Sequence, residues 1–124
     1  MAAPNVVSVT SIYGKTVFDA DISTSDDAIL TNAASSNKLL KINSLVISNI
    51  DGTNAADITV TIKTASGSVL AKLANTISVP ADSTLVVISK DTSIYLEEDR
   101  AIHLDASAAG DLAGVCSYEE IDDA

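Results

Sequence analysis

The sequence predicts an all-β protein, a single antiparallel β-sandwich or jelly-roll-like barrel of about eight to ten short strands. Its 124 residues are enough for one domain with one core. Hydrophobic residues make up 47% of the chain, but aromatic residues only 3%, and there is no Trp. The core must therefore consist of Val, Ile, Leu and Ala, and β-branched side chains of this kind pack well on a pleated surface.

The expected strands are short apolar runs separated by turn residues at fairly even spacing, as in sandwiches and barrels. The clearest half-buried strand is 58–63, where apolar and polar residues alternate. The run 85–88 is continuously apolar, which predicts a strand covered on both faces. At most one helical turn is expected, near 97–99. In chain order the expected strands cover residues 6–12, 15–19, 28–31, 39–49, 58–63, 69–73, 77–79, 85–88, 94–96, 102–107 and 112–118.

The longest of these strands, 39–49, changes phase in its middle. Leu40 and Ile42 share one phase, whereas Leu45 and Ile47 share the other. Because side chains alternate with a period of two, one face cannot bury both pairs without a slip. We therefore expect a β-bulge or kink near Asn43 and Ser44.

The charge and the two ends of the chain restrict partners and location. The net charge is −10 with only seven Lys and Arg, so no basic stripe is expected to contact nucleic acid. The N-terminus lacks the pattern of a signal peptide, and no apolar run is long enough to span a membrane. One cysteine excludes an internal disulfide framework, in keeping with synthesis in a reducing cytoplasm. We interpret 1–124 as one domain, with 1–5 as a possible N-terminal arm and 119–124 as an acidic C-terminal tail.

The stretch NIDGTNAADITV contains the most suggestive polar spacing. Asp51, Asn54 and Asp57 recur every three positions, and hard cations such as Ca²⁺ take carboxylate and amide oxygens. The pattern departs from the EF-hand loop. Asp-Gly is also a strong turn dipeptide, and Asn and Asp bond to their own backbone. We interpret the stretch as a hairpin connection that turns the chain between two strands, with a calcium loop as the alternative.

The remaining candidate groups also have simpler structural interpretations. The carboxylates at 97–99, with Asp105 nearby, could form an acid–base pair, but we interpret them as a solvated turn with Arg100 as local partner. His103 and Cys116 are the only His and Cys, and His103 is expected to point outward. No nucleotide-binding or nucleophile-elbow motif is present. We therefore expect a protein that is not an enzyme, with no catalytic residue, cofactor or metal.

Three stretches together are similar to a known group of proteins. They are ASSNKLLKINSLVISNIDGTNAADITVTI at 34–62, ISVPADSTLVVISKDTSIYLEEDRAIHLDAS at 77–107, and DLAGVCSYEEI at 111–121. They resemble small virion structural proteins of tailed phages, especially those that infect marine cyanobacteria. One departure is Asp99, where a LEEGD-like turn would carry Gly; Asp tolerates left-handed φ better than most residues.

The resemblance implies a place in a virus particle and carries no catalytic residues. It implies a head decoration or cement protein that binds the outer surface of the major capsid protein lattice and stabilises the head, with a homotrimer favoured. Neither nucleic acid nor membrane is an expected partner. One alternative is a neck, tail or fibre-associated subunit. Another is a surface module that binds sugar or calcium.

Overall fold

The computed structural model describes residues 6–122, and nearly all of its regular structure is β-strand. The only helix in this range is a 3₁₀ turn, η1, Lys90–Thr92. The helical turn expected near 97–99 does not form, because residues 98–99 are a non-helical turn before β8. The strands are β1 Ser11–Asp19, β2 Asp27–Asn32, β3 Lys38–Asn49, β4 Ala56–Lys63, β5 Val69–Val79, β6 Thr84–Ile88, β7 Ile94–Leu96, β8 Arg100–Ala106 and β9 Leu112–Asp122.

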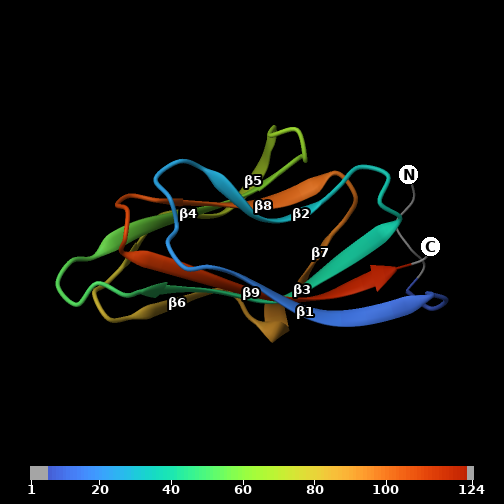
Figure 1. Cartoon of the computed structure of the whole chain (residues 1–124), viewed down its shortest axis with the longest axis horizontal. Helices are drawn as coiled ribbons and strands as arrows, with labels where there is room; N and C mark the ends of the chain where they lie inside the picture. Colours follow the sequence, from blue (N-terminus) through green and yellow to red (C-terminus); the bar gives the residue numbers. More distant parts are fainter. Residues whose placement is uncertain (1–5, 123–124) are drawn as a thin grey trace.

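The strands form two antiparallel sheets that pack face to face, so the predicted sandwich is confirmed (Figure 1). Sheet A has the order β1-β9-β3-β6, with β7 also paired to β3. Sheet B has the order β2-β8-β4-β5. Each long connection alternates between the sheets, and with β7 set aside as an extra strand this is the connectivity of a jelly roll.

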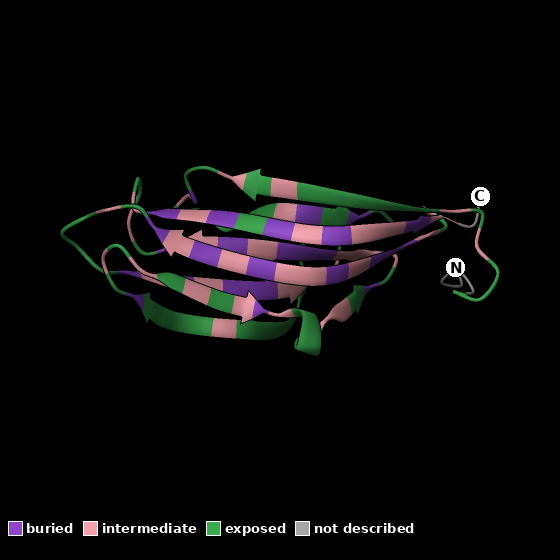
Figure 2. Cartoon of the chain, turned by 90° about the horizontal axis from the view of Figure 1, so that it is seen from below, coloured by how far each residue is buried: buried purple, intermediate pink, exposed green. Residues whose placement is uncertain are grey.

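The core lies between the sheets and is aliphatic. Burial alternates along β3, β4, β8 and β9, as Figure 2 shows for the strands of sheet A. Fully buried side chains come from both sheets and from the β1–β2 connection: Ile22, Ile42, Leu45, Ile47, Ile58, Val60, Val79, Leu96, Ile102, Leu104, Leu112 and Cys116. Ile, Leu and Val thus supply nearly all of the core volume, as the composition predicts.

The phase change in the longest strand is a β-bulge, as predicted. Ile42 of β3 pairs with Tyr118, but Ser44 pairs with the next residue, Ser117, so Asn43 is the extra residue. The Asn43 side chain donates a hydrogen bond to Glu119 at 2.9 Å. The bulge lets Leu40 and Ile42 face the same core as Leu45 and Ile47.

Two expected strand breaks do not occur, because pairing to a neighbour continues through them. β1 runs without interruption across Gly14, which pairs with Glu119 of β9. β5 is a single strand over 69–79, although its register against β4 shifts three times. Ladder pairing therefore overrides the local weakness of a Gly or of a polar residue.

The other differences concern the first strand, β6 and the C-terminal residues. The strand expected over 6–12 begins only at Ser11, and residues 6–10 form turns and bends. β6 is an edge strand of sheet A, and Val86 is 56% exposed, so the prediction of a strand covered on both faces is wrong. Val86 and Ile88 pair with consecutive residues of β3, so Val87 is a bulge that makes the run look continuously apolar. The expected acidic tail is strand over 119–122; residues 123–124 and the expected arm at 1–5 lie outside the described residues.

The turn before β8 and the open side of the sandwich complete the fold. Asp99 has φ of 61°, so it holds the left-handed conformation for which a Gly would be expected.

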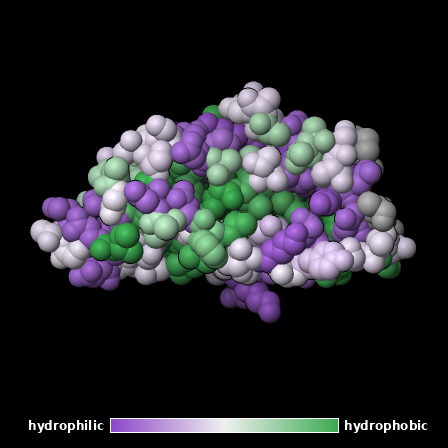
Figure 3. Space-filling model, viewed as in Figure 1, coloured by the Kyte–Doolittle hydropathy of each residue, from purple (hydrophilic) through white to green (hydrophobic). Residues whose placement is uncertain are grey.

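β1 and β2 border the two sheets on the side that faces the viewer in Figure 1. There hydrophobic side chains reach the surface between the sheets (Figure 3), and Val17 and Ile29 are partly buried against the core.

Candidate functional site

The loop that contains Asp51, Asn54 and Asp57 is held together by its own hydrogen bonds. Asp51 accepts from the backbone N–H of Thr53 at 2.8 Å and from Asn54 through both its backbone and its side chain at 3.3 Å. Asn49 fixes the base of the loop, because its side-chain amide donates to the carbonyls of Asn54 and Val79. The loop therefore turns the chain between β3 and β4, as expected, and its carboxylate accepts hydrogen bonds from the backbone. It is not the expected hairpin, because β3 and β4 belong to different sheets and do not pair.

Asp57 does not join the other two residues. It lies on β4, where its backbone N–H bonds to the Ser107 hydroxyl at 2.8 Å. The carboxyl group beside Asp51 is instead Asp111: burial and the Asp51 charge raise the pKa of Asp111. Hydrogen bonds from Thr53 lower the pKa of Asp51. Within residues 6–122, no three His, Cys, Asp or Glu side chains form a group that could hold a metal ion.

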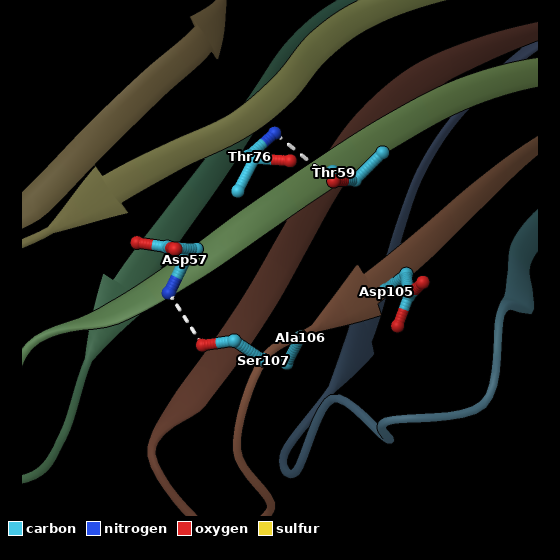
Figure 4. Close-up of a pocket in the computed structure, with 6 residues that line it drawn as sticks. All are labelled: Asp57, Thr59, Thr76, Asp105, Ala106 and Ser107. Carbon is cyan, nitrogen blue, oxygen red and sulfur yellow. Dashed lines mark hydrogen bonds between the residues drawn. The ribbon is translucent and has the colours of Figure 1, made fainter.

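A polar groove lies on the outer face of sheet B. One part of it, shown in Figure 4, is lined by Asp57, Thr59, Thr76, Asp105, Ala106 and Ser107. The bulged register of β5 opens this part: β5 carries extra residues opposite Thr59, and the Thr76 N–H donates to the Thr59 hydroxyl at 3.0 Å. Thr76 has φ of 55°, which turns the chain at this bulge.

The groove continues towards Asp26, Thr61, Lys63, Val69 and Lys72, with Thr59 and Asp105 common to both parts. In this second part the Asp26 carboxylate, from the β1–β2 connection, contacts two residues of sheet B. It accepts a hydrogen bond from the Lys63 ammonium and lies 3.6 Å from His103 Nδ1.

The surroundings of His103 favour its neutral form by lowering its pKa. Burial lowers its pKa most, the Lys63 charge lowers it further, and Asp27 partly opposes both. Its Nδ1 atom is buried and makes no hydrogen bond. An opposite charge at 3.6 Å would favour protonation, but Lys63 already neutralises Asp26. The His103 side chain lies on the outer face of sheet B beside Lys63 and Asp26.

His103 and Cys116 lie on different sheets and do not meet. His103 is on the outer face of sheet B, as predicted, paired with Thr61. Cys116 is fully buried on the inner face of sheet A, and burial raises the pKa of its thiol to about 11. A thiol in that state is a poor nucleophile.

The carboxylates at 97–99 stay in a turn, with Asp105 elsewhere. Arg100 is the local partner, but it donates to the backbone carbonyls of Glu98 and Asp99 at 3.4 and 3.2 Å. Asp105 lies on β8 opposite Thr59, in the groove. The structure thus brings together Asp57 and Asp105, two acidic residues that were considered separately in the sequence.

The groove has the chemistry of a hydrogen-bonding surface. Hydroxyl groups and carboxylates line both of its parts, and two lysines lie in the second part only. The Thr59 and Ser107 hydroxyls accept hydrogen bonds from the backbone N–H groups of Thr76 and Asp57. Sequence reasoning missed Thr76 and Ser107 because their position depends on the register of β5 and on the end of β8.

Comparisons with known proteins add no relative. No protein-family model matches the chain, and no curated protein or solved structure matches it. The described residues include no helix that is long and apolar enough to cross a membrane.

Proposed function

We propose that this chain is a non-enzymatic structural protein of a virus particle. In this role it is a capsid decoration, or cement, protein that is made in the host cytoplasm. It binds the outer surface of the major capsid protein lattice, stabilises the head and associates with itself, with a trimer favoured. The resemblance of the three stretches at 34–62, 77–107 and 111–121 to phage virion proteins motivates the proposal.

The observation that carries the proposal is the jelly-roll connectivity of the two sheets. Jelly rolls serve in viral capsids, and also in lectins and cupins. In this chain the space between the sheets is filled by aliphatic side chains, and the described residues place no group of metal ligands there. Such an interior favours a rigid building block over a barrel that holds a ligand, although the link from fold to function is an analogy.

Copy number in purified particles tests this proposal. Quantitative mass spectrometry should give a ratio to the major capsid protein near one to one, or a simple fraction of it set by the lattice. Adding the purified protein to heads that lack it should raise the temperature at which the heads open. Absence from clean particles would contradict every structural role in the virion.

A neck, tail or fibre-associated subunit is the alternative within the same class. The same fold would serve there, because fold alone does not set location. A handful of copies per particle, matching a ring, would favour this alternative. Immunogold labelling at one vertex or along the tail would place the subunit.

A surface module that binds sugar or calcium is a second candidate, and the polar groove on sheet B favours it. For the loop at 51–57, saturating Ca²⁺ should leave the melting temperature unchanged, because Asp51 is engaged with its own backbone. A specific site on the native state would instead raise the melting temperature by mass action. Loss of such a rise in Asp51→Asn, with retention in Asp91→Asn, would assign it to the loop.

A further inference from the structure

The outer face of sheet A carries an apolar row that crosses all four main strands. Phe18 of β1 pairs with Val115 of β9, Val115 with Val46 of β3, and Val46 with Val86 of β6. Phe18 is 74% exposed, Val86 56% and Val115 42%. The row therefore presents apolar side chains outward from neighbouring strands, and Figure 2 looks onto this face.

The positions on either side of this row are small and uncharged. One flanking row is Thr16, Ser117 and Ser44, and the other is Ala113, Ser48 and Thr84. We call these two rows and the apolar row between them the uncharged face. The first charged residues beyond it on the central strands are Lys41 and Glu119, which have opposite sign and face each other. Charged residues make up 19% of the chain, so their absence from this face is a local feature.

From this surface we infer that the uncharged face is a pairing site for a second copy of this chain. Two copies carry −10 each, so their charged surfaces repel, and this face lets them meet without a like-charge contact. A basic partner would be attracted to the acidic surfaces and would gain nothing here. Charge depletion with exposed Phe and Val is also the composition of an interface centre.

The geometry of two sheets that meet face to face sets the expected arrangement. Sheets that pack face to face keep their strands roughly aligned. With a twofold axis in the interface parallel to the strands, Phe18 of one copy faces Val86 of its partner, and Val115 faces Val46. The bulky residue at one end of the row then meets the smaller residue at the other end. A trimer needs a heterologous contact through other surfaces, so a threefold association would be separate from this pairing.

The size of the face predicts weak, reversible pairing. Four strands about 4.8 Å apart and three rows about 6.8 Å apart cover about 400 Å² per copy. The total of about 800 Å² is at the low end for specific interfaces. Association should therefore depend on concentration over about 10 µM to 1 mM, and should strengthen with salt, because salt screens the remaining repulsion.

Sedimentation equilibrium of the full chain tests the pairing with a matched pair of variants. Val86→Lys places an ammonium in the uncharged face and should weaken association by about tenfold or more, which lowers the weight-average mass at a given concentration towards that of the monomer. Val69→Lys is the control, because Val69 is 58% exposed on the outer face of sheet B. A wild-type chain that stays monomeric or forms only trimers would overturn the pairing, as would equal effects of both variants.

Cysteine cross-linking tests the arrangement without relying on the lysine variant. Mixing Phe18→Cys with Val86→Cys should give a disulfide-linked pair, whereas each variant alone should give none. The native Cys116 is buried and does not compete. Cross-linking of Phe18→Cys alone, or none in the mixture, would contradict the arrangement. Either outcome is independent of whether the chain is found in virus particles.

Discussion

The outer faces of the two sheets differ although both belong to one sandwich. On sheet A the outward side chains around Val115 and Val46 are apolar or small, and none is charged. On sheet B the outward side chains form a groove with Asp57, Asp105 and Lys63. Charge is costly to bury against a partner unless it is paired. The contrast indicates that sheet A is suited to a dry contact and sheet B to water or a polar ligand.

The largest expected effect is on the free energy of unfolding, and it distinguishes the core-facing side of β9 from its outer side. Gly114 lies beside Val115 but faces the core, where an added Cβ would be 3.0 Å from Leu104 Cδ1 and 3.4 Å from Ile22 Cδ1. Gly114→Val should lower the free energy of unfolding by about 2–3 kcal/mol, since overpacking strains a filled core. Urea denaturation measures this change.

Gly14→Val is the matched control for that prediction. Gly14 faces outward on β1, and nothing lies within 4 Å of an added Cβ. Its free energy of unfolding should stay within about 0.5 kcal/mol of wild type or rise slightly, because Val suits a strand better than Gly. Equal losses in the two variants would show that the outer face of sheet A is not open at β1.

A smaller effect on stability is expected from a substitution on sheet B, where charged side chains interact. Lys63→Met removes the partner of Asp26, which then faces His103 alone across 3.6 Å. The pKa of His103 should rise, since Lys63 lowers it in the native chain. Stability should change by less than about 1 kcal/mol, as for partly exposed ion pairs.

An NMR titration of the only imidazole in the chain measures the pKa of His103 directly. Lys72→Met is the control, because Lys72 lines the same groove but contacts Asn75 instead. A His103 pKa that rises equally in both variants would mean that overall charge, and not the local contact, sets it.

The smallest expected effect is a pH dependence of the melting temperature that comes from His103 on sheet B. The folded pKa of His103 is lowered from 6.5, so the unfolded chain binds a proton more readily. The stabilisation is complete above pH 6.5 and is lost as the pH falls towards the folded pKa. The melting temperature should therefore fall slightly from about pH 7 to about pH 5, and less so in His103→Gln.

The control for this pH effect is a substitution on the uncharged face, where no side chain titrates. Ser117→Ala changes an outward residue of sheet A and should keep the wild-type slope of melting temperature against pH. A slope that persists fully in His103→Gln would assign the effect to carboxylates elsewhere in the molecule.

The local pattern of the sequence determined where most strands lie and which residues face inward. The alternation over 58–63, the bulge at Asn43 and the turn at 51–54 were all predictable, because each depends on a few adjacent residues. The left-handed φ of Asp99 agrees with the turn that the resemblance implies. The β-branched, nearly aromatic-free composition determined the sandwich class.

Only the tertiary structure decided which strands are neighbours. The sequence does not show that β6 is an edge strand, that β1 continues through Gly14, or that β5 shifts register three times. The groove on sheet B and the uncharged face on sheet A both arise from residues of distant strands brought side by side. Side-chain alternation is a property of one strand, whereas a surface needs the order and register of several, which long-range pairing sets.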